Sequence, residues 1–174
     1  MAPEFNLREE IKKRDLNIFH VFIASLLGQL AERGTLNIGF LNMILRSIGE
    51  KIAEYLTVVI GPFSKMGDIK ENIKKSIEEI VSYLDPFKEY SLGFVQNGLI
   101  IQINADTCKF CPKRVGGAEL PRSLCPFPVL IGEIISNRIK LKLEPIIPGV
   151  RRRKINEKTY CVFGYRIGEI KEES

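Results

Sequence analysis

A chain of 174 residues with 45% hydrophobic and 27% charged side chains has the composition of an ordinary globular protein, and its length predicts one domain with a full core. The 26 basic and 21 acidic residues give a net charge of +5, a mild surplus that solubility explains, so we do not expect nucleic acid as a partner. The sequence shows no secretory signal and no apolar run long enough to span a bilayer, which predicts a cytoplasmic protein without a membrane span.

The N-terminal part divides into a polar and an apolar stretch. Residues 1–17 are mostly polar and predict an extension with a short surface helix over 8–14. Residues 18–33 are apolar on nearly all sides, which predicts a buried helix and the start of a single domain over 18–170. His20 lies in this stretch and is the only histidine, so we expect a buried or interface residue and no histidine-based catalytic set.

Two further helices are predicted before the first strands. Apolar residues recur at helical spacing between Phe40 and Leu56. Asp68 then has the properties of an N-cap, with Glu71 at the capping-box position. The helix that follows has one apolar face, made of Ile69, Ile73, Ile77, Ile80 and Leu84. Helices therefore occupy the first half of the chain.

A hairpin is predicted where the pattern changes from helical to strand-like. Residues 90–96 and 99–105 are two β-like runs, and they are separated by Asn97 and Gly98. An Asn-Gly pair favours the left-handed conformations of a type I′ turn, so we expect the two runs to pair as antiparallel strands.

The last third of the chain predicts one helix and two strands. Apolar spacing over 126–139 indicates a late helix, and residues 140–147 and 159–167 are strand-like. The basic segment 148–158 is expected to join these strands as a turn. Its run from Arg151 to Lys154 is then expected at a solvated tip and not in contact with phosphate.

Four cysteines form the one constellation in the chain that indicates a specific chemistry. Cys108 and Cys111 are separated by two residues, a spacing at which both thiolates of a tight turn bind one zinc ion. Cys125 opens the late helix, and Cys161 lies on the last strand, where period-two alternation places it on one face with Phe163. The sequence therefore predicts a tetrahedral zinc site with four cysteine ligands.

Other interpretations of these cysteines stay open. One alternative is a disulfide or redox pair. This alternative is less typical of a reducing compartment, and the CxxC pair lacks the βα context of a thioredoxin-type protein. An iron–sulfur cluster uses the same ligand type. Cys161 by itself is also compatible with a small buried hydrophobic residue, in which case its thiol would be inert.

Several short stretches of the chain resemble the 4-vinyl reductase domain family, a group of small-molecule (hydrocarbon-binding) modules whose fold is similar to that of certain tethering subunits of the TRAPP complex. These stretches are glycine-based or strand-forming and span most of residues 18–168. They are 27–34 with 41–56, the Cys125-Pro126 pair that opens a helix containing Gly132, and the strands at 141–144 and 160–163.

The resemblance implies an α+β fold, with an antiparallel sheet of about four strands flanked by N-terminal helices and one late helix. It also implies an apolar ligand cavity near the metal-bearing end of the molecule and a homodimer built through the N-terminal helices. The family's name mentions a reductase, but the resemblance does not imply catalysis.

The metal ligands of that family match this chain in part. Cys125, Glu144 and Cys161 stand at ligand positions of the family, but Ile147 stands where a further cysteine is expected. The earlier CxxC pair is expected to replace the lost ligand and to give four thiolates. The alternative is a site that includes Glu144 as a carboxylate ligand.

A set of aromatic and methionine side chains is the candidate lining of a ligand pocket, although aromatics at such spacings are also typical of core packing. The set is Phe19, Phe22, Phe40, Met43, Phe94, Phe127 and Phe163. We therefore expect a zinc-containing domain that binds or senses an apolar or aromatic small molecule without catalysis. The alternatives are a structural adaptor that binds a protein partner, which a large exposed apolar patch would favour, and, third, a redox or metal-dependent enzyme.

Overall fold

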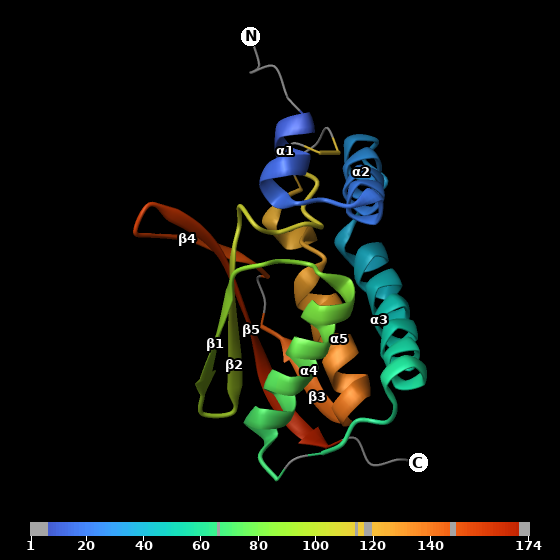
Figure 1. Cartoon of the computed structure of the whole chain (residues 1–174), viewed down its shortest axis with the longest axis vertical. Helices are drawn as coiled ribbons and strands as arrows, with labels where there is room; N and C mark the ends of the chain where they lie inside the picture. Colours follow the sequence, from blue (N-terminus) through green and yellow to red (C-terminus); the bar gives the residue numbers. More distant parts are fainter. Residues whose placement is uncertain (1–6, 66, 114, 117–119, 147–148, 171–174) are drawn as a thin grey trace.

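The computed structural model describes residues 7–65, 67–113, 115–116, 120–146 and 149–170. Figure 1 shows a sheet with the helices gathered on one side of it, which confirms the predicted α+β class. The helices are α1 (Leu7–Arg14), α2 (Ile18–Glu32), α3 (Ile38–Ile60), α4 (Ile69–Leu84) and α5 (Phe127–Ile139), with a short 3-10 helix η1 (Arg122–Leu124) before α5. The strands are β1 (Tyr90–Val95), β2 (Gly98–Asn104), β3 (Leu141–Pro145), β4 (Arg151–Ile155) and β5 (Lys158–Ile170).

Side chains cap the N-termini of three helices. The Asn17 side chain accepts a hydrogen bond from the His20 backbone N–H at 3.0 Å and starts α2. The Asn37 side chain accepts a hydrogen bond from the Phe40 backbone N–H and starts α3. This helix is longer at both ends than the apolar spacing predicted. The predicted cap of α4 is confirmed, because the Asp68 carboxylate accepts from the Lys70 N–H at 3.1 Å. Short polar residues therefore set where these helices begin.

The long strand β5 organises the sheet. All pairs are antiparallel, and the order is β1-β2-β5-β3, with β4 also paired to β5. Cys161 of β5 stands opposite Ile103 of β2 and also opposite Arg152 of β4. Strand β2 therefore lies along one side of β5. Strands β4 and β3 lie along the other side, where β4 pairs with the first half of β5 and β3 with the second half.

The β1–β2 hairpin is confirmed, but its turn is not the predicted one. Val95 pairs with Gly98, so the two-residue loop is Gln96-Asn97, and of these only Asn97 has a positive φ, at 53°. The type I′ conformation occurs instead between β4 and β5, where Asn156 and Glu157 have φ values of 46° and 66°.

The basic segment before β5 is a strand and not a turn, so this prediction was wrong. All five residues of β4 are exposed, and the strand is held by backbone pairing from Arg151 opposite Val162 to Ile155 opposite Lys158. Its sequence lacks the apolar alternation of a half-buried strand because neither face is buried. Charged side chains on such an edge strand oppose pairing with other chains.

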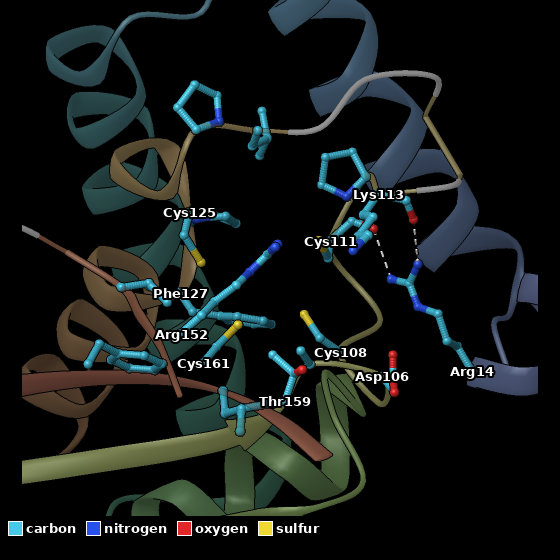
Figure 2. A pocket seen from close by; sticks show the side chains of 18 of the residues that line it. Arg14, Asp106, Cys108, Cys111, Lys113, Cys125, Phe127, Arg152, Thr159 and Cys161 are labelled. Carbon is cyan, nitrogen blue, oxygen red and sulfur yellow. Dashed lines mark hydrogen bonds between the residues drawn. The ribbon is translucent and has the colours of Figure 1, made fainter. Parts of the chain in front are cut away.

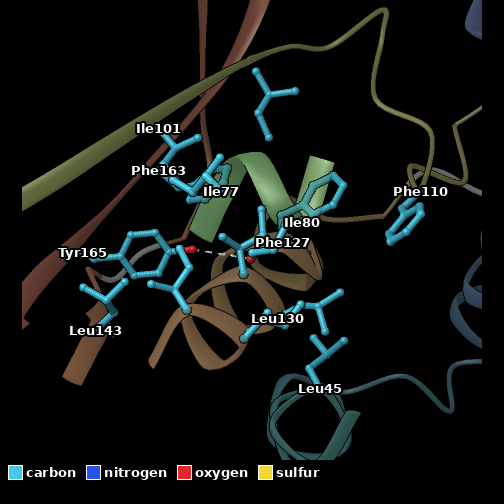
Figure 3. Close-up of a cluster of buried hydrophobic side chains, with 14 of the residues drawn as sticks. Leu45, Ile77, Ile80, Ile101, Phe110, Phe127, Leu130, Leu143, Phe163 and Tyr165 are labelled. Atoms are coloured by element: carbon cyan, nitrogen blue, oxygen red, sulfur yellow. Dashed lines mark hydrogen bonds between the residues drawn. The ribbon is translucent and has the colours of Figure 1, made fainter. Parts of the chain in front are cut away.

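The core lies between the sheet and the helices α3, α4 and α5. Gly49 lets α3 approach α5 closely, since a β-carbon there would stand 2.7 Å from the Glu133 β-carbon. Figure 3 shows how Tyr165 of β5 reaches the start of α5, where its hydroxyl donates to the Phe127 carbonyl at 3.5 Å. Among the described residues, no helix combines the length and the apolarity needed to cross a membrane.

Candidate metal centre

The four cysteines line one cavity of about 180 Å³. They come from three segments: the turn after β2, the residue pair that opens α5, and the central strand β5. Figure 2 shows their side chains, with the Arg152 side chain reaching between them from β4. The cysteines that the sequence grouped by spacing are therefore brought together by the sheet topology. The four are Cys108, Cys111, Cys125 and Cys161.

Each segment has a local reason for its place. Cys161 lies on the helix-facing side of β5 with the buried Phe163 and Tyr165 two and four residues later, as the alternation predicted. Cys125 precedes Pro126, whose fixed φ favours the start of a helix. The CxxC turn is tied down where the backbone N–H of Lys109 donates to the Pro86 carbonyl at 2.9 Å.

The first two thiols form a hydrogen-bonded pair. Cys108 donates to Cys111, which raises the pKa of Cys108 well above its ordinary value, and burial raises it further. The same hydrogen bond lowers the pKa of Cys111 to about 6, helped by a backbone hydrogen bond at Lys113 and by the charges of Arg14 and Arg152. This hydrogen bond therefore favours the thiolate form of Cys111, which is the form in which cysteine binds metal.

The thiol of Cys125 has the opposite character. Burial raises its pKa to about 12, and the neighbouring Cys161 and Cys111 add to this rise. A bound cation reverses such shifts, because it stabilises every thiolate around it. A set of four thiols that line one cavity is chemically suited to a soft metal ion.

The cysteines are not yet arranged as a coordination shell. Among the described residues, no group of three or more His, Cys, Asp or Glu side chains is placed to hold a metal ion. All four thiols nevertheless face one cavity, and two of them are in hydrogen-bond contact. The donor set therefore fits zinc in type and number.

The structure places Glu144 outside this cavity. Its carboxylate forms an ion pair with Lys142 at 2.6 Å, and this pairing lowers its pKa. It lines a second cavity of about 660 Å³ between α3, α5 and β3, and Cys125 lies in the wall of both cavities. The geometry thus favours the four-cysteine set over the alternative with a carboxylate.

Arg14 at the end of α1 is part of the site, although the sequence placed it in a polar extension. Only 4% of its surface is exposed, and it lines the cavity. Its guanidinium donates to the Cys111 carbonyl at 2.8 Å and to the Lys113 carbonyl at 3.1 Å. No sequence signal distinguishes this residue from the neighbouring charges of the extension.

The candidate pocket residues separate into two groups. Phe127 and Phe163 are buried and line the cysteine cavity, and Phe127 stacks on Phe110 with ring centres 5.4 Å apart. The other five residues of the predicted set do not line it. Phe94 is half-buried on β1. The remaining four are exposed on α2 and α3, with exposed fractions of 71% for Phe19, 64% for Phe22, 42% for Phe40 and 63% for Met43.

His20 is confirmed as a buried, satisfied residue. Its Nδ1 accepts from the Asn17 backbone N–H at 3.1 Å, which leaves Nε2 protonated to donate to the Leu84 carbonyl at 3.3 Å. Desolvation lowers its pKa, so the ring is neutral at neutral pH. It does not line the cysteine cavity.

The comparisons with known proteins place the chain in a family. The model of the MJ0207 family matches residues 34–167, so the chain belongs to this family. A relative from Methanocaldococcus jannaschii, described as "Uncharacterized protein MJ1342", is 31% identical over 117 residues, which cover 66% of this chain and 92% of the relative. The matched segment contains all four cysteines, whereas α1 and α2 precede it.

Proposed function

We propose that this protein is a non-catalytic zinc-containing interaction domain of the cytoplasm. In this proposal Cys108, Cys111, Cys125 and Cys161 bind one zinc ion that joins the CxxC turn, the start of α5 and β5. The supporting observation is that all four thiols line one cavity although they come from three distant segments. A zinc ion with four thiolate ligands has no open position for water, so its role is structural.

The partner surface in this proposal is the outer side of α2. We define the α2 face as Ile18, Phe19, Phe22 and Leu26, which recur at helical spacing and are 47–74% exposed. Exposed apolar residues that form one stripe are typical of interaction sites. Residues 18–31 contain no Asp, Glu, Lys or Arg.

A second copy of the chain is the partner that best fits the α2 face. In a two-fold dimer each patch meets its own copy, so a charged patch would place like charges opposite one another. The uncharged α2 face avoids this repulsion. The resemblance to the 4-vinyl reductase domain family independently predicts a homodimer through the N-terminal helices, and we propose such a dimer.

A second candidate function is the binding of an apolar or aromatic small molecule. It is favoured by the buried rings of Phe127 and Phe163 in the cavity wall and by the adjoining cavity of about 660 Å³. That volume falls within the range of small-molecule sites. Charged residues of α3, α5 and β3 line much of the larger cavity, so the ligand would need polar groups at one end. Native mass spectrometry of purified protein would reveal such a copurified molecule.

The zinc proposal is tested by elemental analysis of protein purified without chelator. Wild type is expected to contain about one zinc per chain. Cys125→Ser should lose the metal, whereas Glu144→Gln, the matched change at the rival ligand, should retain it. Metal-free wild type would refute the proposal, and loss of zinc from the Glu144→Gln variant would show that the ligand set is wrong.

A further inference from the structure

Most of the net charge of the chain lies in the β4–β5 hairpin, which we define as residues 151–158. They form β4, the turn and the start of β5, and they contain five basic residues and one acidic residue. The hairpin therefore carries a net charge of +4, whereas the whole chain has +5. A surplus spread over a surface serves solubility, but a surplus in one segment creates a local positive potential. The five basic residues are Arg151, Arg152, Arg153, Lys154 and Lys158.

Three of these cations are not engaged within the described part of the protein. Lys158 forms an ion pair with Glu89 at 3.1 Å, and Arg152 lines the cysteine cavity. The other three are exposed on β4, and no hydrogen bond or ion pair with another described residue involves their side chains. These three are Arg151, Arg153 and Lys154. Their charges are therefore available to an anion outside the protein.

Neither packing nor protection of the sheet edge accounts for this charge. Strand β4 buries neither of its faces, so its side chains contribute little to the core. A charge on an edge strand opposes pairing with other chains whatever its sign. Four consecutive cations also repel one another, and a mixture of signs would protect the edge without this repulsion. An anionic partner would offset the repulsion.

The β4–β5 hairpin is a narrow ribbon with cations on both faces. The register of β2 with β5 ends at Tyr160, so residues 154–159 form a two-stranded ribbon beyond it. Figure 1 shows β4 projecting away from the helices. Period-two alternation places Arg151 and Arg153 on the outer face of the sheet and Lys154 on the opposite face.

The major groove of duplex DNA fits this shape better than a flat anionic surface does. The groove is about 12 Å wide and admits a two-stranded β-ribbon, and phosphates follow both of its walls. A ribbon in the groove can reach phosphate with the cations of both faces, whereas a membrane meets one face at a time. We therefore propose that the β4–β5 hairpin binds the phosphate backbone of double-stranded DNA from the major groove. This function does not require the zinc site or a dimer.

Binding through so few phosphate contacts should be weak and dependent on salt. Contacts from Arg151, Arg153 and Lys154 neutralise about three phosphates, which predicts a slope of about −3 when the logarithm of the association constant is plotted against that of the salt concentration. At low salt we expect a dissociation constant of about 1–100 µM. Phosphate contacts carry no sequence information, so duplexes of different sequence should bind alike.

Fluorescence anisotropy of a labelled DNA duplex with the full-length protein tests this proposal. The double variant Arg151→Gln/Arg153→Gln should bind at least about tenfold more weakly at low salt, and its slope should be smaller by about 2. The matched control Lys65→Gln/Lys70→Gln removes the same charge from exposed positions near the start of α4 and should bind as wild type. Unchanged binding by the arginine variant, equal losses in the two double variants, or no binding by wild type would overturn the proposal.

A charge change in the opposite direction gives an independent test. Glu157→Gln removes the acidic residue of the hairpin and should tighten DNA binding by about two- to fivefold. A variant that binds no more tightly than wild type would contradict a contact between the hairpin and phosphate.

Two further probes distinguish DNA from other polyanions. Duplex RNA of the same sequence has a deep, narrow major groove and should bind more weakly. Equal affinity for this RNA, or tighter binding to vesicles of phosphatidylserine and phosphatidylcholine, would overturn the assignment to DNA. The zinc content of the arginine variant should equal that of wild type, so a failure of the zinc proposal would be a separate result.

Discussion

Gly28 of α2 lies so close to Gly116, in the loop after the CxxC turn, that a β-carbon on Gly28 would stand 2.3 Å from the Gly116 carbonyl oxygen. A β-carbon on Gly116 would in turn stand 2.3 Å from the Ala24 carbonyl oxygen. Both obstacles are backbone atoms and have no rotamer to relieve the clash. The helix α2 and this loop therefore fit together only because both positions lack side chains.

Gly28→Ala should therefore destabilise the protein. Overpacking typically costs about 1–3 kcal/mol, which exceeds the gain of up to about 1 kcal/mol from better helix propensity. Urea unfolding would measure the change in the free energy of unfolding. Gly39→Ala in α3 is the matched control, because its β-carbon would meet only the Asn37 side chain at 3.6 Å and should cause no loss. Equal stability of the two variants would show that the close approach is absent.

His20 should make stability depend on pH. Its folded-state pKa lies below the ordinary value of 6.5, so on acidification the unfolded state takes up the proton first. The free energy of unfolding is then greatest above about pH 6.5 and falls as the pH is lowered towards 5. His20→Gln removes this titration and should show a shallower decline over the same range. A decline as steep as that of wild type would mean that His20 is not buried in its neutral form.

Glu89 should govern stability at lower pH. Hydrogen bonds from Asn104, Tyr160 and Lys158 lower its pKa from 4.5 to about 2. The stability that it contributes is therefore complete above about pH 4.5 and is lost as the pH falls towards 2. Glu89→Gln should be less stable than wild type at neutral pH and should lose less on acidification. Parallel acid-unfolding curves for the two proteins would contradict this role.

Arg138 should be among the most costly single substitutions outside the cysteine cavity. Its guanidinium is buried and donates to Glu79 at 2.9 and 3.0 Å, to the Thr57 hydroxyl at 3.0 Å and to the Gly61 carbonyl at 3.1 Å. Arg138→Met leaves the largely buried Glu79 without its partner and should cost about 3–5 kcal/mol. Adding Glu79→Leu should restore much of the lost free energy of unfolding, measured by urea unfolding, because it removes the unpaired carboxylate. If Arg138 acted only by packing, the second substitution would not restore stability.

The sequence predicted the elements that have a local signal. Asp68 marked the start of α4, and helical spacing marked α3 and α5. The strand β4 had no such signal, because all five of its residues are exposed and its only support is pairing with β5. The hairpin turn shifted by one residue because Gly98 pairs within the sheet, where Val95 leaves little room for a side chain.

The candidate site was predictable in its cysteines and not in its surroundings. The CxxC spacing identifies Cys108 and Cys111 from local sequence. Arg14, in contrast, stands among other charged residues of the N-terminal extension, and its burial depends on tertiary contacts alone. The helix α2 is apolar on nearly all sides, so its periodicity gave no direction for Phe19 and Phe22. Their exposure shifts the expected role of these rings from pocket lining to association.

X-ray absorption at the zinc edge tests most directly whether four thiolates surround one zinc ion in this protein. Protein purified without chelator should show a first shell of about four sulfur atoms at about 2.3 Å. The glutamate variant Glu144→Gln should give the same spectrum. A first shell with oxygen in place of one or more sulfurs, or a protein that holds no zinc, would contradict the account.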